Sequence, residues 1–216
     1  MTARIHRRFL ATAERVAPPL KAALIRVGRI GPPEPRRRSL ACFLARAVVG
    51  QQLSTIAARS IWARVEAAAR ASGCGIPGFF AARHARRLRA CGLSRAKVRT
   101  LIAIREAHEA GRLSARRLRR MSHAERSAVL RTIHGIGQWT ADMAGIFYFR
   151  DPDVWPVGDV GVQRGLKVAL GRCSARTMER IGAAFAPYRS FLALYLWRLL
   201  DGAPARSGRA DSRRPV

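Results

Sequence analysis

The chain has 216 residues, of which 41 are Lys or Arg and 13 are Asp or Glu, so its formal net charge is +28. A field this positive indicates a polyanionic partner, either nucleic acid or an anionic membrane surface. The apolar fraction of 49% is that of an ordinary folded protein, which excludes a disordered basic chain for most of the length.

The sequence predicts a soluble protein of the cytoplasm. Its richest apolar stretch, residues 181–197, is interrupted by Arg189 and is no membrane span. Residues 1–30 are Arg-rich like a transit peptide, but their helical apolar periodicity favours a part of the fold, so no secretion signal is expected. The cysteines are too dispersed for a zinc site or an iron–sulfur cluster and are expected to be reduced. They are Cys42, Cys74, Cys91 and Cys173.

Helical periodicity begins at the N-terminus. Residues 1–35 are predicted to form a helical extension that packs on the rest of the protein, with a break at Pro18 and Pro19. Ser39 is placed to cap a helix that ends near Gly50.

Further start signals follow along the chain. Ser54 is placed to cap a second helix, and Ser122 with Glu125 forms a capping box that opens another. The other predicted helices cover residues 79–88, 94–110, 138–149, 160–170, 174–186 and 188–200. No convincing strand pattern occurs, so the predicted class is all-α. Residues 201–216 have almost nothing to bury and are predicted to be a disordered basic tail.

Two apolar helices flank the segment Ile133-His134-Gly135-Ile136-Gly137-Gln138-Trp139-Thr140-Ala141. Glycines two positions apart suggest a hairpin with conformations or close approaches that a side chain would forbid, and Ile136 can anchor it in the core. Amides at the start of the second helix would then bind a DNA phosphate without reading its sequence. An ordinary helix connection with glycine at the helix end is the alternative, and the charge of +28 favours the DNA site.

On these residues the sequence resembles the helix-hairpin-helix DNA glycosylases, and most closely their 3-methyladenine DNA glycosylase II branch. The resemblance extends to Val49-Gly50-Gln51-Gln52-Leu53-Ser54 and to Pro187-Tyr188-Arg189-Ser190 with the helix after it. It implies a two-lobed helical HhH-GPD core over residues 36–200, with the active site in the cleft between the lobes.

Asp159 follows Trp155-Pro156-Val157-Gly158 and, by resemblance, occupies the family's catalytic aspartate position. A carboxylate there can stabilise positive charge on the sugar and orient or deprotonate the attacking water. Asp159 is also placed to cap a helix, and the two roles are compatible. Asp151 and Asp153 are interpreted as turn formers, and Asp142 as a structural residue.

Some members of the family cut the DNA backbone with a lysine where this chain has Trp139. The resemblance therefore implies a monofunctional glycosylase without AP lyase activity, which hydrolyses alkylated purines of the 3-methyladenine type in duplex DNA and so initiates base excision repair. Lys167 is expected to contact phosphate or solvent. A glycosylase for another damaged base and a non-catalytic DNA-backbone-binding module are the alternatives.

A base flipped out of the duplex is held by stacking on aromatic rings. The resemblance places Trp139 and Trp197 in this pocket, with Trp155 and Tyr148 as further candidates and Met143 where relatives often have tyrosine. Gln52 or Leu53 falls where the family inserts a side chain into the gap, although the pair could also be a mere helix boundary.

The resemblance also implies the remaining partners of the hairpin. The residues expected to bind the DNA backbone are Gly135, Ile136, Gly137, Gln138 and Thr140. Backbone carbonyls of Ile133 and Ile136 are candidate ligands of a structural Na⁺ or K⁺. Otherwise no cofactor and no iron–sulfur cluster are expected, and the protein is predicted to be a monomer that acts on damaged double-stranded DNA without a membrane.

Overall fold

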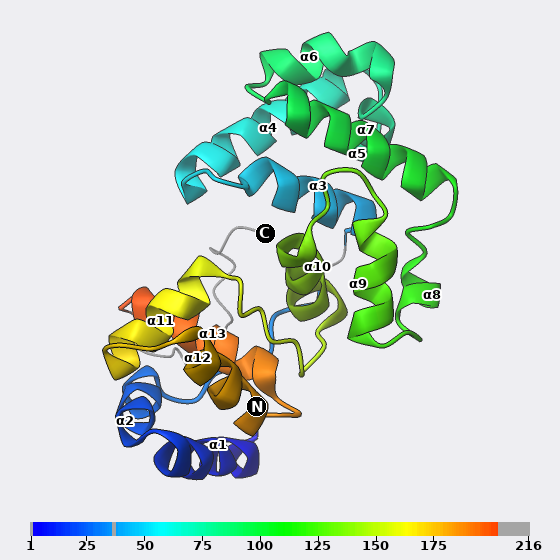
Figure 1. Ribbon diagram of the computed structural model, residues 1–216. Coiled ribbons are helices and arrows are strands. Elements are labelled where there is room, and N and C mark those ends of the chain that lie inside the picture. The colour runs from blue at the N-terminus through cyan, green and yellow to red at the C-terminus, as the bar shows by residue number, and fades with distance from the viewer. Residues whose placement is uncertain (1, 36–37, 203–216) are drawn as a thin grey trace. The chain divides into compact units, whose positions relative to one another are not determined.

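The computed structural model describes residues 2–35 and 38–202, and in this part of the chain every regular element is a helix. The all-α prediction is therefore confirmed. These residues divide into two compact units, one formed by residues 2–34 with 150–202 and the other by residues 35–149 (Figure 1). The predicted cleft between two lobes stays a prediction. Most of the tail predicted to be disordered, from residue 203 on, lies outside the described residues.

Helices of the first unit come from both ends of the chain. They are α1 (Ala3–Val16), α2 (Pro18–Val27), α11 (Val160–Leu170), α12 (Ala175–Ala184) and α13 (Arg189–Leu200). The N-terminal pair belongs to the core of this unit, because α1 contacts α12 while α2 contacts α11 and α13. Phe9 packs edge-on against Phe185, and His6 Nδ1 lies 2.7 Å from the hydroxyl of the fully buried Tyr195.

The second unit contains all the other helices. They are α3 (Leu40–Gly50), α4 (Thr55–Ala71), α5 (Ile76–Phe79), the 3₁₀ turn η1 (Ala82–His84), α6 (Ala85–Ala90), α7 (Arg95–Glu109), α8 (Ala115–Leu118), α9 (His123–Arg131), α10 (Gln138–Met143) and the π-helical η2 (Ala144–Phe149). Helix α3 lies at the centre, since it contacts α4, α7, α10 and η2. Its Leu44, Ala45 and Val49 are fully buried.

Short polar side chains start these helices as predicted. Ser39 and Ser54 each accept a hydrogen bond at 3.3 Å from the amide three residues on. The capping box of Ser122 and Glu125 is present with both of its hydrogen bonds. Such caps satisfy amides that have no partner within the helix. None of the described helices is both long enough and apolar enough to cross a lipid bilayer.

Two predicted helices differ in the structure. The single helix predicted over residues 79–88 is wrong, because α5 ends at Phe79 and the chain turns through η1 before α6 begins. The turn buries Phe79 and Phe80 completely. Pro77 is compatible with α5 because it lies in the first turn, where a backbone N–H has no partner within the helix. The helix predicted over residues 138–149 widens to π geometry at Ala144, and all six residues of the π-helical segment are buried.

Candidate active site

Asp159 is the N-cap of α11, and its carboxylate is held from two helices. Its Oδ1 atom accepts a hydrogen bond from the Val162 amide at 2.8 Å and another from the Trp197 indole N–H at 2.7 Å. The helix N-terminus also stabilises a negative charge at this position. The predicted capping role is confirmed, and the carboxylate is fixed in one orientation by both bonds.

Two glycines four residues apart allow α13 to approach Asp159. A Cβ atom on Gly161 would lie 2.7 Å from Trp197 Cδ1 and 3.0 Å from Asp159 Oδ1. A Cβ atom on Gly165 would lie 2.8 Å from the carbonyl oxygen of Leu196. The sequence analysis missed this pair, although glycine at positions i and i+4 of an apolar helix is a signal of close helix packing.

The loop before Asp159 is tied to the start of α13. The Arg189 guanidinium donates to both carboxylate oxygens of Asp153, at 2.8 and 2.9 Å, and this hydrogen bonding raises the pKa of Arg189. Ser190 Oγ donates to the Asp151 carbonyl at 2.7 Å. Asp153 is thus an ion-pair partner as well as a turn residue, whereas Asp151 accepts from the Asp153 amide as a turn former does.

The hairpin has the glycine conformation that its sequence suggests. Gly135 has φ +80°, and a Cβ atom there would lie 1.9 Å from Thr100 Oγ1 of α7. Ile136 is buried, as expected for an anchor, and its amide donates to the Ile133 carbonyl at 3.0 Å. Gly137 is the N-cap of α10 and offers no side chain to the first amides of that helix.

Two polar hairpin side chains are engaged inside the second unit. Gln138 Nε2 donates to Asp142 Oδ1 at 2.8 Å, and Thr140, only 1% exposed, accepts from Gln51 Nε2 at 3.1 Å. Gln138 is exposed, whereas Thr140 is buried as a whole residue, so the binding of these two residues to the DNA backbone stays a prediction. Asp142 is buried and also lies 2.9 Å from His123 Nε2, which supports its structural interpretation.

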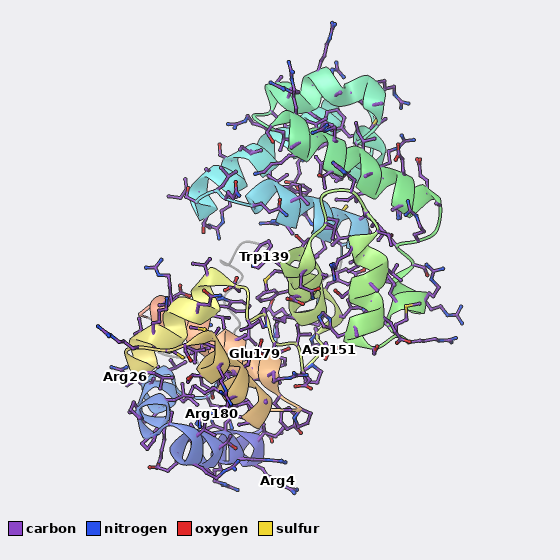
Figure 2. All side chains as sticks on the ribbon, in the orientation of Figure 1. Arg4, Arg26, Trp139, Asp151, Glu179 and Arg180 are labelled. Carbon is purple, nitrogen blue, oxygen red and sulfur yellow. The ribbon has the colours of Figure 1, made fainter. Side chains whose placement is uncertain are left out.

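Tryptophans predicted for the base pocket occur in both units. Trp139 is half-buried at the first turn of α10 (Figure 2). Trp197, 6% exposed, is the hydrogen-bond donor to Asp159 on α13. Trp155 packs on Gly182, where a Cβ atom would lie within 2.7 Å of three indole atoms. Their stacking on a base stays a prediction.

Met143 and Tyr148 are buried within the second unit. The Tyr148 ring packs 5.6 Å from that of Phe43, and the Arg119 guanidinium lies 5.8 Å from its centroid. Burial raises the pKa of the Tyr148 phenol. Both residues thus contribute to the core, and their role in a base pocket stays a prediction.

The segment between α3 and α4 presents the predicted wedge residues at the surface. Gln52 is exposed and has φ +56°, a left-handed conformation that residues other than glycine, asparagine and aspartate rarely adopt. Leu53 is 40% exposed, and Ile56 in the first turn of α4 is 82% exposed. The sequence analysis missed Ile56, although the residues three and four positions later, Arg59 and Ser60, are polar and indicate an exposed helix face.

Basic side chains cover the surface of both units. Arg4 and Arg26 project from α1 and α2 (Figure 2), and Lys167 is exposed on α11. Between residues 83 and 131 most arginines are exposed; Arg105 is half-buried and Arg126 buried. Such charge provides salt-sensitive attraction to a polyanion.

The described residues contain no group of three or more His, Cys, Asp or Glu side chains that could hold a metal ion. A site for a monovalent cation is different, because its ligands are backbone carbonyl oxygens rather than these side chains. The Ile133 carbonyl accepts the Ile136 amide, and a carbonyl oxygen has a second lone pair for a cation.

The chain is similar to known proteins over most of its length. DNA-3-methyladenine glycosylase 1 of Schizosaccharomyces pombe is 30% identical over 177 residues, which cover 80% of this chain and 75% of that protein. The crystal structure of a DNA-3-methyladenine glycosidase from Bacillus halodurans shares 31% identity and a TM-score of 0.72, covering 86% of each chain. The S. pombe 3-methyladenine DNA glycosylase in complex with abasic DNA shares 27% identity and a TM-score of 0.77, covering 87% of this chain and 94% of that one. No protein-family model matches the chain.

Proposed function

The chain belongs to the family of DNA-3-methyladenine glycosylases, and from this premise we propose that it hydrolyses the N-glycosidic bond of alkylated purines in double-stranded DNA. Bases of the 3-methyladenine type are the proposed substrates, and an abasic site is the product, so the reaction initiates base excision repair. The observation that carries the proposal is the carboxylate of Asp159, held by an amide and an indole N–H.

Asp159 supplies the chemistry in this proposal. As the bond between the sugar and the alkylated base breaks, the base takes the bonding electrons and the sugar becomes positively charged. The fixed carboxylate stabilises that charge and takes a proton from the water that attacks the sugar. Because Oδ1 already accepts two hydrogen bonds, the carboxylate needs little reorganisation during the reaction.

DNA is held mainly through its backbone in the proposed complex. The amides around Gly137 bind a phosphate, and Gln52 or Leu53 fills the gap that the flipped nucleotide leaves. The exposure of both side chains supports this role. A Na⁺ or K⁺ ion at the carbonyls of Ile133 and Ile136 would add positive charge beside the phosphate.

The reaction stops at the abasic site. Trp139 has no amine that could form a Schiff base with the sugar, so no AP lyase activity is expected from this position. We further propose that the protein acts as a monomer on the DNA of the cytoplasm and needs no cofactor for hydrolysis.

A base-release assay tests the proposed function. The protein is incubated with methylated duplex DNA, and the free bases are separated by chromatography while the strands are analysed with and without alkali. We expect 3-methyladenine to be released and the strands to break only after alkali. Release of no base would contradict the glycosylase function, and strand breaks without alkali would contradict the monofunctional mechanism.

Gly161→Ala should slow base release, because the new methyl group would displace both the Trp197 indole and the Asp159 carboxylate. A displacement near 1 Å at a catalytic group can lower the rate by about 100-fold. Single-turnover release rates are the measurement. Gly158→Ala is the matched control, since a Cβ atom there has no described atom within 4 Å. Equal release rates for the two variants would contradict a role of the contact between Trp197 and Asp159 in base release.

A further inference from the structure

Lys97 in the first turn of α7 holds the backbone just before the exposed wedge residues. Its ammonium donates to the carbonyl oxygens of Val49 and Gln51, each at 2.8 Å. These carbonyls belong to the C-terminal end of α3, where a positive charge is stabilising. Lys97 is one of three lysines among the 41 basic residues, and it is half-buried.

The same helix, α7, also supports the hairpin. Ser94 caps the helix by accepting a hydrogen bond from the Lys97 amide at 3.2 Å. This cap fixes where α7 begins and therefore where Lys97 lies. Thr100 lies one turn later and fills the space beside Gly135 that a Cβ atom would need. Helix α7 is therefore a common support for the wedge segment and the phosphate-binding turn.

Contacts on both sides hold Gln52 in its left-handed conformation. Before it, the Gln51 carbonyl is bound by Lys97 and the Gln51 side chain donates to Thr140. After it, the Leu53 amide donates to the Gly50 carbonyl at 3.3 Å. A glutamine keeps a positive φ only where its surroundings impose one, and such backbone strain is typical of functional sites.

We propose that Lys97 is a positioning residue, which sets the wedge segment Gln52-Leu53 at a defined place relative to the hairpin so that it can enter the gap in DNA. This inference rests on the proposed function. Two of the three N–H donors of the ammonium are engaged by these carbonyls, so the role that we assign to Lys97 is to hold the backbone rather than to contact DNA. Burial lowers the pKa of the Lys97 amine, as expected for a group that serves the interior rather than bulk solvent.

The test compares two DNA duplexes of one sequence, one undamaged and one with a tetrahydrofuran abasic analogue. Fluorescence anisotropy measures the dissociation constant for each. Because a hydrogen-bonded charge is lost, Lys97→Met should lower the preference for the abasic duplex by about tenfold or more. Arg99→Met is the matched control, since it removes one exposed positive charge from the same helix and should weaken both duplexes alike. An unchanged preference in Lys97→Met would overturn the inference.

Hydrogen exchange of the free protein gives a readout that does not depend on DNA. Amides of residues 50–54 should exchange faster in Lys97→Met than in wild type and stay unchanged in Arg99→Met; unchanged protection in Lys97→Met would also overturn the inference. If Lys97→Met fails to fold, Lys97→Gln serves instead, because its amide still donates but is too short to reach both carbonyls. A wild-type protein without any preference for the abasic duplex would contradict the proposed function itself, which separates the two failures.

Discussion

Asp159→Asn should abolish base release while leaving DNA affinity unchanged or improved. The substitution removes the negative charge that stabilises the developing positive charge on the sugar, and such losses lower rates by about 10²–10³-fold. Asparagine is as good an N-cap as aspartate, so α11 should still begin at the same residue. Single-turnover release from methylated DNA measures the rate, and anisotropy with an undamaged duplex measures the affinity.

The control for this experiment is Asp151→Asn in the same loop. It removes one carboxylate too, but its amide oxygen can still accept the Asp153 amide. The release rate should therefore stay near that of the wild-type protein. If Asp159→Asn still released 3-methyladenine at the original rate, the mechanistic assignment of this carboxylate would be wrong.

Gly137→Asp should weaken binding to damaged and undamaged duplex alike without unfolding the protein. An aspartate at the N-cap of α10 can accept the first amides of the helix, which stabilises the helix but takes these donors from a phosphate and adds repulsion. Loss of one charge-assisted hydrogen bond costs about 1.5–3 kcal/mol, or roughly ten- to a hundredfold in affinity. Anisotropy on both duplexes and a thermal melt are the measurements.

Two alanine variants separate charge from shape at the hairpin. Gly137→Ala should bind DNA nearly as the wild type does, because no described atom lies within 4 Å of the added Cβ. Gly135→Ala should lower the melting temperature, since its Cβ would overlap Thr100 and its φ is positive. If Gly137→Asp weakened DNA binding only for duplexes with one type of lesion, this result would contradict a phosphate-binding site that acts independently of the DNA sequence.

Local patterns were sufficient for most of the helices, for their caps and for the glycine conformation of the hairpin. Ser39, Ser54 and the Ser122–Glu125 box could be predicted because a cap depends on a side chain and an amide three residues apart. The division of residues 76–90 could not be predicted, since it follows from burying Phe79 and Phe80. Tertiary packing overrides helix periodicity over such short segments.

By itself the sequence determined an all-helical basic protein with a glycine hairpin and an aspartate at a helix start. Only the tertiary structure decided which groups hold that aspartate and the exposed loop. The Trp197 indole reaches Asp159 across 38 positions, and Lys97 reaches Gln51 across 46. Contacts so distant along the chain depend on how helices pack, and packing leaves no local periodicity from which such a pair could be identified.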